Sequence, residues 1–179
     1  EAETEGVSTS TLDRALSGLE FEPRVIELQG RQPESRQIFR QYIRSRISQQ
    51  RLDKAGAELA RHRDLLDQVA GRFGVQPRFI IALWAVESDF GRNTGSWSTI
   101  QSLASLAYGG RRRDYFRREL IAALRLVEAI PEHSKMTGSW AGAVGQCQFM
   151  PSNVRRLAVD FDGDGRADIW DSLPDVFAS

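Results

Sequence analysis

The sequence predicts a mainly helical fold. Apolar residues recur at helical spacing in several separate stretches, and the sequence contains no strand of convincing length and no internal repeat. With 179 residues, of which 41% are hydrophobic, the chain is long enough to bury a core. These observations indicate one helical domain, or one domain with a small appendage.

Prolines and glycines set the expected limits of the helices. The apolar spacing predicts helices over residues 11–19, 35–47, 50–72, 77–91, 99–107, 114–130 and 151–159. Pro77 suits the first turn of the helix over 77–91, and Pro131 ends the helix over 114–130.

The remaining segments are expected to be irregular. Residues 1–10 are small and polar, which predicts a frayed lead-in. Two prolines and a glycine favour an extended connector over residues 21–33, and the glycine- and alanine-rich residues 138–148 favour a loop. Another helix begins near Pro174, so the ending at Ser179 suggests a fragment.

The composition excludes some classes of partner. The 24 basic and 24 acidic residues give a formal net charge of zero, so nucleic acid is not an expected partner. Cys147 is the only cysteine, which excludes an internal disulfide and fits either the cytoplasm or a bacterial periplasm. No apolar run is long enough to span a bilayer. The chain starts at Glu1 without Met, which indicates a processed or trimmed start and is compatible with the removal of a signal peptide or lipid anchor.

Glu87 is the first candidate functional residue. It ends the apolar stretch from Phe79 to Val86. A carboxylate on so apolar a segment is costly unless it is paired, exposed in a cleft or protonated. Burial would raise its pKa, which suits a general acid that works near neutral pH. This stretch by itself favours a simpler interpretation, a solvent-facing residue where the helix leaves the core, because most glutamates lie on the surface.

Residues 160–171 fit the twelve-residue EF-hand loop. Asp160, Asp162 and Asp164 supply acidic oxygens at the first, third and fifth positions, and Gly165 takes the sixth, where the chain must turn sharply. Hard oxygen ligands at this spacing favour Ca²⁺ over zinc or copper. Because the sequence has one such loop, whereas calcium sensors usually pair theirs, a structural ion is the preferred interpretation over a switch.

The later positions of the loop complete the expected ligand set. Arg166 at the seventh position would contribute its backbone carbonyl, and Asp168 at the ninth could act through water. Asp171 takes the twelfth position, which is usually a bidentate Glu. The alternative is an Asp- and Gly-rich turn that binds no metal.

An ordered set of short motifs extends from about residue 70 to the end of the chain. Its members are Gly74-Val75-Gln76-Pro77, Val86-Glu87-Ser88, Phe90-Gly91, Arg113-Asp114-Tyr115-Phe116, Gly138-Ser139-Trp140-Ala141-Gly142-Ala143, Gln148-Phe149-Met150-Pro151-Ser152 and the aspartate loop. In these motifs the chain resembles the membrane-bound lytic murein transglycosylase B family of bacterial peptidoglycan-cleaving enzymes. The resemblance extends more loosely back to about Tyr42.

The resemblance implies a lysozyme-like catalytic core over residues 74–179, C-terminally incomplete, on which an N-terminal helical segment over 1–73 packs. It implies that Glu87 cleaves the MurNAc–GlcNAc bond, first as acid and then as base, and leaves a 1,6-anhydro product. The implied partner is the peptidoglycan glycan strand, and the implied location is the periplasm, with a precursor that could be membrane-anchored. We expect a monomer without an organic cofactor.

The resemblance also implies roles in substrate binding. Ser139 and Gln148 match family positions that hydrogen-bond the sugar or orient the catalytic carboxyl, although a tight structural loop explains them equally well. Tyr42 lies in a segment that resembles one with a substrate-contacting tyrosine; its spacing with Phe39 and Ile43 fits the core.

The sequence departs from the family in two places. Gly145-Gln146-Cys147-Gln148 replaces a usual Gly-Tyr-Gly-Gln turn, and the family has further groove tyrosines beyond the point where this chain stops. Cys147 is interpreted as a small residue and not a nucleophile, because no motif links it to the histidines at positions 62 and 133.

Other functions remain open from the sequence. A muramidase would need a second carboxylate. Asp89 lies only two residues from Glu87, so it would point to another helix face, and nothing in the spacing selects Asp114 or Glu119. A non-catalytic glycan-binding module and a calcium-responsive interaction protein are the alternatives outside catalysis.

Overall fold

The computed structural model describes residues 1–31, 47–130 and 135–179, and these are mainly helical, as predicted. The chain divides into two compact units, each built from two separate stretches of sequence. Unit 1 comprises Glu1–Arg31 and Thr94–Leu157, and unit 2 comprises Gln32–Asn93 and Ala158–Ser179. The helix expected over 35–47 and its Tyr42 lie outside the described residues, except for Ile47.

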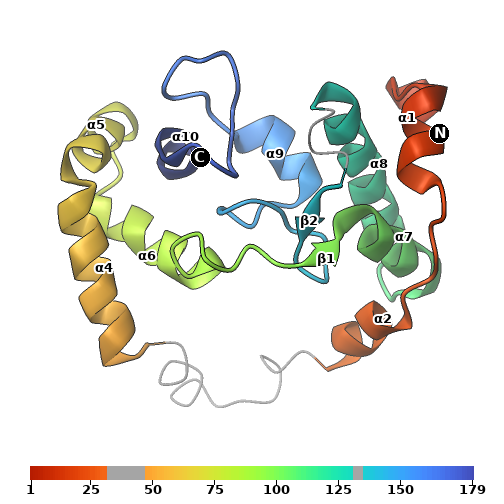
Figure 1. Cartoon of the computed structure of the whole chain (residues 1–179), viewed down its shortest axis with the longest axis horizontal. Coiled ribbons are helices and arrows are strands. Elements are labelled where there is room, and N and C mark those ends of the chain that lie inside the picture. Colours follow the sequence, from red (N-terminus) through yellow and green to blue (C-terminus); the bar gives the residue numbers. More distant parts are fainter. Residues whose placement is uncertain (32–46, 131–134) are drawn as a thin grey trace. The chain divides into compact units, whose positions relative to one another are not determined.

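Unit 1 is built around a pair of long helices (Figure 1). Its elements are the 3-10 turn η1 (Glu3–Glu5) and α1 (Thr9–Leu16), α2 (Pro23–Gly30), β1 (Trp97–Ser98), α7 (Thr99–Gly109), α8 (Arg113–Ala129), β2 (Thr137–Gly138) and α9 (Pro151–Leu157). α7 packs against α8 and α2, and α8 also packs against α1 and α9. Leu103 and Leu106 of α7 and Ala123 of α8 are completely buried in this core. β1 and β2 form a short antiparallel pair in which Trp97 lies opposite Gly138.

The beginning of the chain is more ordered than predicted. The frayed lead-in expected over residues 1–10 is wrong, because Val7 is 3% exposed in the core and α1 already starts at Thr9. The extended connector expected over 21–33 is also wrong. Pro23 occupies the first turn of α2, where a proline needs no N–H partner, and Val25 is buried.

Unit 2 contains α4 (Gln49–Arg61), α5 (Arg63–Phe73), α6 (Pro77–Ser88) and α10 (Leu173–Ala178). α6 packs against α4 and α5, and α10 packs against α5. The ring of Trp84 meets Phe90 and Phe177 edge to face, with ring centres 5.5 Å and 5.1 Å away. This aromatic cluster packs α10 against the end of α6. In the described part of the chain, no helix is both long and apolar enough to cross a membrane.

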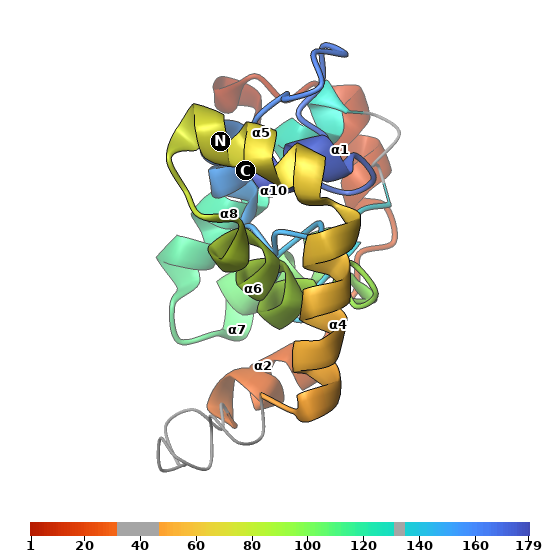
Figure 2. The same ribbon diagram turned by 90° about the vertical axis from the view of Figure 1, so that its left-hand side faces the viewer.

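The single helix expected over 50–72 is wrong, because it is interrupted at His62. Figure 2 shows α4 and α5 as separate helices that meet at a bend. His62 has a non-helical backbone, and its ring packs edge to face on Trp84 and Phe177. Its Nε2 lies 3.3 Å from Oε2 of the buried Glu58. The break therefore comes from contacts with residues distant in sequence.

Candidate functional site

Glu87 lies in the last turn of α6, in unit 2. α6 starts at Pro77 and turns Ile81, Trp84 and Ser88 into the interior. Glu87 is on the exposed side of the helix with Leu83 and Val86, which are 62% and 58% exposed. Although Glu87 is exposed, partial desolvation of its carboxyl by the surrounding protein raises its pKa. A raised pKa keeps a carboxyl protonated to higher pH, as a general acid requires.

A left-handed turn follows Glu87 directly. Asp89, Phe90 and Gly91 have φ angles of 52°, 62° and 75°, and only the last of them is glycine. The Ser88 hydroxyl accepts a hydrogen bond from Gly91 N–H at 3.1 Å and donates one to the Trp84 carbonyl at 3.3 Å. These two hydrogen bonds connect the turn to the end of α6. Such a run of non-glycine left-handed residues is strained and is found mostly where surrounding contacts enforce it.

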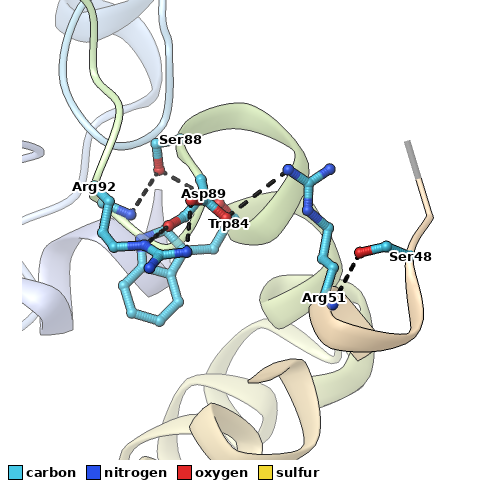
Figure 3. A network of polar contacts seen from close by, with 7 residues as sticks. Ser48, Arg51, Trp84, Ser88, Asp89 and Arg92 are labelled. Carbon is cyan, nitrogen blue, oxygen red and sulfur yellow. Dashed lines mark hydrogen bonds and ion pairs between the residues drawn. The ribbon is translucent and has the colours of Figure 1, made fainter. Parts of the chain in front are cut away.

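Asp89 is ion-paired in this turn (Figure 3). Its Oδ2 accepts a hydrogen bond from Arg92 Nη2 at 2.7 Å, and its Oδ1 lies 3.8 Å from Nη2 of Arg51 on α4. The sequence reasoning placed Asp89 on the helix, which is wrong. Asp89 is instead the residue that caps the C-terminus of α6. Two arginines neutralise the carboxylate nearest to Glu87 in the sequence.

Ser139 and Gln148 come together in one turn system of unit 1. The Ser139 hydroxyl accepts a hydrogen bond from Ala143 N–H at 3.0 Å. Bridges from Val144 to Gly138 and to Phe149 join the two ends of the segment. Gln148 has a left-handed φ of 50°, and its Nε2 donates to the carbonyls of Thr94 and Gly145 at 2.9 Å and 3.0 Å. Both side chains are half-buried and fixed by the backbone around them.

Close backbone packing supports this turn system. Gly95 has a φ of 94°, and a side chain there would collide with the carbonyl group of Gly138. A side chain at Gly142 would collide with Leu103 of α7. The glycine-rich loop predicted over 138–148 is therefore a tightly packed structure. Cys147, within it, is partly buried.

Glu119 has a structural role in unit 1. It is 4% exposed, and its carboxylate accepts hydrogen bonds from the N–H and the hydroxyl of Ser152 at the start of α9. Asp114 is exposed in the first turn of α8, where an acidic residue favours the helix.

The aspartate loop of unit 2 gathers its first three acidic residues. Ligand oxygens of Asp160, Asp162 and Asp164 all lie within 4.8 Å of one another. Gly165 takes the sharp turn with a φ of 93°, as its position in the motif requires. Three carboxylates gathered around one point are the hard ligands that Ca²⁺ prefers, so the residues present fit this ion.

The later loop positions are arranged by hydrogen bonds. Arg166 N–H donates to Asp164 Oδ1 at 2.8 Å, and Asp171 N–H donates to Asp168 Oδ1 at 3.0 Å. Asp168 and Asp171 do not belong to the three-aspartate cluster. Ser172 donates its hydroxyl to Asp162 Oδ2 at 2.8 Å, so the residue after the loop also orients a candidate ligand.

Asp175 is a loop-organising residue that the sequence reasoning missed. It is fully buried, and its two oxygens accept hydrogen bonds from Phe161 N–H at 2.7 Å and Asp168 N–H at 2.8 Å. One carboxylate thus joins the two arms of the aspartate loop. The signal for it was the Ser172-x-x-Asp175 capping pattern before an apolar pair; the Ser172 hydroxyl indeed accepts from Asp175 N–H.

Comparisons with known proteins confirm the resemblance. The family described as "Transglycosylase SLT domain" matches residues 1–179. Membrane-bound lytic murein transglycosylase B of Escherichia coli (strain K12) is 36% identical over 114 residues, which make up 63% of this chain and 32% of that protein.

Solved structures of lytic transglycosylases have the same fold. SltB3 from Pseudomonas aeruginosa, in complex with NAG-NAM-pentapeptide, matches with a TM-score of 0.92 and 39% identity over 99% of this chain and 48% of that chain. Escherichia coli Slt35, in complex with calcium, matches with a TM-score of 0.86 and 29% identity over 99% of this chain and 57% of that chain. The chain spans about a third of the curated relative and about half of these solved structures.

Proposed function

Because the chain belongs to the transglycosylase SLT domain family, we propose that it is a lytic transglycosylase that cleaves peptidoglycan glycan strands. The bond cleaved is the β-1,4 link from MurNAc to GlcNAc, and the product carries a 1,6-anhydromuramic acid end. The observation that carries this proposal is the setting of Glu87, a partly desolvated carboxyl with a raised pKa beside an aspartate that is already ion-paired. The relative SltB3, solved with a NAG-NAM-pentapeptide, supports the substrate class.

The proposed reaction needs one carboxyl group. Protonated Glu87 donates its proton to the glycosidic oxygen, the bond from C1 of MurNAc to that oxygen breaks, and an oxocarbenium-like centre develops at C1. The Glu87 carboxylate then takes the proton of the C6 hydroxyl of the same MurNAc. The C6 oxygen bonds to C1, which closes the anhydro ring and returns Glu87 to its protonated state. No water is consumed, so the cleavage is a lyase reaction.

The setting of the other acids supports this reaction over hydrolysis. A muramidase of the usual kind needs a second free carboxylate to act as nucleophile or to activate water. Asp89 is held by Arg51 and Arg92, and Glu119 is occupied by Ser152. Both residues therefore have structural partners.

Ser139, Gln148 and Tyr42 are the proposed substrate-binding residues. Ser139 and Gln148 are fixed by their backbone neighbours, so their positions are set before a glycan arrives. The Gln148 amide N–H groups already bind two carbonyls, which turns its carbonyl oxygen away from them and leaves it as an acceptor for a sugar hydroxyl. Tyr42 is proposed on the resemblance alone.

Asp160, Asp162, Asp164, Asp171 and the carbonyl of Arg166 are the proposed holders of a structural Ca²⁺. The gathered oxygens of the first three and the calcium-bound structure of Slt35 support this. The ion would neutralise the clustered carboxylates and stabilise the loop, with no part in the chemistry at Glu87. In thermal unfolding, Ca²⁺ but not an equal concentration of Mg²⁺ should raise the melting temperature, and Asp160→Asn should remove the rise. An unchanged melting temperature on adding Ca²⁺ or a chelator would exclude the site.

We further propose that the protein works in the periplasm as a monomer, from a precursor that could be membrane-anchored. The name of the Escherichia coli relative, a membrane-bound lytic murein transglycosylase, supports this location.

Digestion of purified sacculi tests the proposed function. Mass spectrometry of the released muropeptides should find anhydro ends, which are one water lighter than the reducing ends that a muramidase leaves. Reducing ends would favour hydrolysis. Binding to sacculi without any product would favour a non-catalytic glycan-binding module.

A further inference from the structure

We propose that Arg51 and Lys54 of α4 are positioning residues that hold the left-handed turn after α6 through Asp89 and Phe90 and thereby fix the Glu87 carboxyl in place. The inference rests on the proposed role of Glu87 in catalysis. It concerns how the chain keeps that side chain in one position.

The turn needs an external restraint. Asp89 and Phe90 are successive non-glycine residues with φ angles of 52° and 62°, a conformation that L-residues with a side chain disfavour. Two of them in a row persist only where surrounding contacts enforce the conformation. Phe90 is 6% exposed and packs on Trp84, which accounts for part of the restraint.

One face of α4 provides the rest. Arg51 and Lys54 are three residues apart and so lie on the same side of the helix. Nη2 of Arg51 lies 3.8 Å from Asp89 Oδ1, and Nζ of Lys54 lies 4.4 Å from the centre of the Phe90 ring. Each strained residue therefore has its own cation from α4. A cation over an aromatic face and an ion pair are both attractive.

The start of α4 is itself fixed. Figure 3 shows the Ser48 hydroxyl accepting a hydrogen bond from Arg51 N–H, at 3.2 Å, while the guanidinium reaches toward Asp89. From the other side of Asp89, Arg92 donates to Oδ2 at 2.7 Å and to the Asp89 carbonyl at 3.4 Å. Asp89 is thus held between the helix before the site and the loop after it.

The left-handed turn also closes the last helical turn of α6. Asp89 N–H donates to the Ala85 carbonyl at 3.2 Å, and Phe90 N–H donates to the Trp84 carbonyl at 3.1 Å. These bonds satisfy carbonyl groups that a helix otherwise leaves without partners at its C-terminus. Glu87 lies within this closed turn. If the turn relaxes, the end of α6 frays and the carboxyl moves, and a displacement of about 1 Å can lower turnover about 100-fold.

Substitutions at position 89 separate the effect of the ion pairs from the effect of the left-handed backbone conformation. Asp89→Ala loses the ion pairs and disfavours the left-handed conformation, so kcat should fall about 10- to 100-fold while KM changes less than about threefold. Asp89→Gly also loses the ion pairs but adopts the left-handed conformation freely, so it should regain part of the lost kcat. A residue with a merely general effect on stability would not show this rescue by glycine.

A double variant tests α4 without altering the turn itself. Arg51→Gln with Lys54→Met removes both cations and keeps long side chains, and should lower kcat about 10-fold. Asp67→Asn is the matched control, because it removes the exposed Arg63–Asp67 pair of the same unit, where the charged atoms lie 3.7 Å apart. All variants are measured well below their melting temperatures.

Backbone chemical shifts provide a readout that does not depend on catalysis. In the wild type, the Cα and Cβ shifts of residues 89 and 90 should be those of left-handed residues, and in Asp89→Ala and the double variant they should move away from them. The inference is overturned if both variants keep these shifts and keep kcat within about twofold of Asp67→Asn. If the wild type releases no product from sacculi, the proposed function fails instead, and the shifts alone decide whether α4 holds the turn.

Discussion

Glu119 holds Ser152 through both oxygens of its carboxylate. Oε2 accepts a hydrogen bond from Ser152 N–H at 3.0 Å, and Oε1 accepts one from the Ser152 hydroxyl at 2.8 Å. The pair connects α8 to the first turn of α9 and buries the carboxylate almost completely. An acid with both oxygens engaged in this way serves the fold.

Glu119→Gln should therefore lower stability and leave the product unchanged. The amide has one oxygen to accept with, so one Ser152 donor loses its partner, at a cost of about 1–3 kcal/mol in the free energy of unfolding. Urea unfolding measures the loss, with the exposed Glu27→Gln of α2 as the control that should be nearly neutral. A folded Glu119→Gln protein that no longer cleaves glycan strands would identify Glu119 as the second acid of a muramidase.

Asp175→Asn should weaken the aspartate loop before any metal binds. The asparagine has one oxygen for two N–H donors, Phe161 and Asp168, so the metal-free protein should lose about 1–3 kcal/mol of stability. Asp171→Asn is the comparison, because it removes a proposed calcium ligand and should lower only the calcium-dependent gain. Urea unfolding with and without Ca²⁺ distinguishes the two effects. Equal stability of Asp175→Asn and wild type in chelator would contradict the role given to Asp175.

The elements that the sequence predicted best are those with strong local signals. α6 starts at Pro77, as expected from the preference of proline for the first turn, and its Ile81, Trp84 and Ala85 are buried. The sharp turn at Gly165 was also predicted, because the motif requires a glycine at that position. In both cases the determining residues are neighbours in the sequence.

The elements that were missed depend on distant contacts. No proline or glycine marks the break at His62, which contacts Trp84 and Phe177 from other parts of the chain. The left-handed conformation of Asp89 was not predictable from the sequence either, since an Asp after a helical stretch more often continues or ends the helix without strain. Its arginine partner on α4 lies 38 residues earlier in the sequence, and no motif connects the two.

The raised pKa of Glu87 predicts two parallel dependences on one titration, one of activity and one of stability. Turnover needs the protonated acid, so activity should fall as the pH rises through the Glu87 pKa. Stability should fall over the same range, because the folded state binds this proton more tightly than the unfolded state does. Glu87→Gln removes the second effect, so at neutral pH it should be as stable as wild type or more stable.

The difference in urea midpoint between wild type and Glu87→Gln, followed from about pH 4 to about pH 8, measures this dependence. Asp67→Asn is the control, because it removes an exposed carboxylate of the same unit that lies outside α6. A difference that stays constant, or that moves in favour of wild type as the pH rises, would contradict a raised pKa at Glu87.

Cleavage of sacculi in water enriched in ¹⁸O tests the central claim most directly, because it asks which oxygen attacks C1. If Glu87 passes the proton from the C6 hydroxyl, every new MurNAc end is anhydro and carries no ¹⁸O, and Glu87→Gln releases no ends at all. New reducing ends that each carry one ¹⁸O atom, or continued release of anhydro ends by Glu87→Gln, would contradict the mechanism.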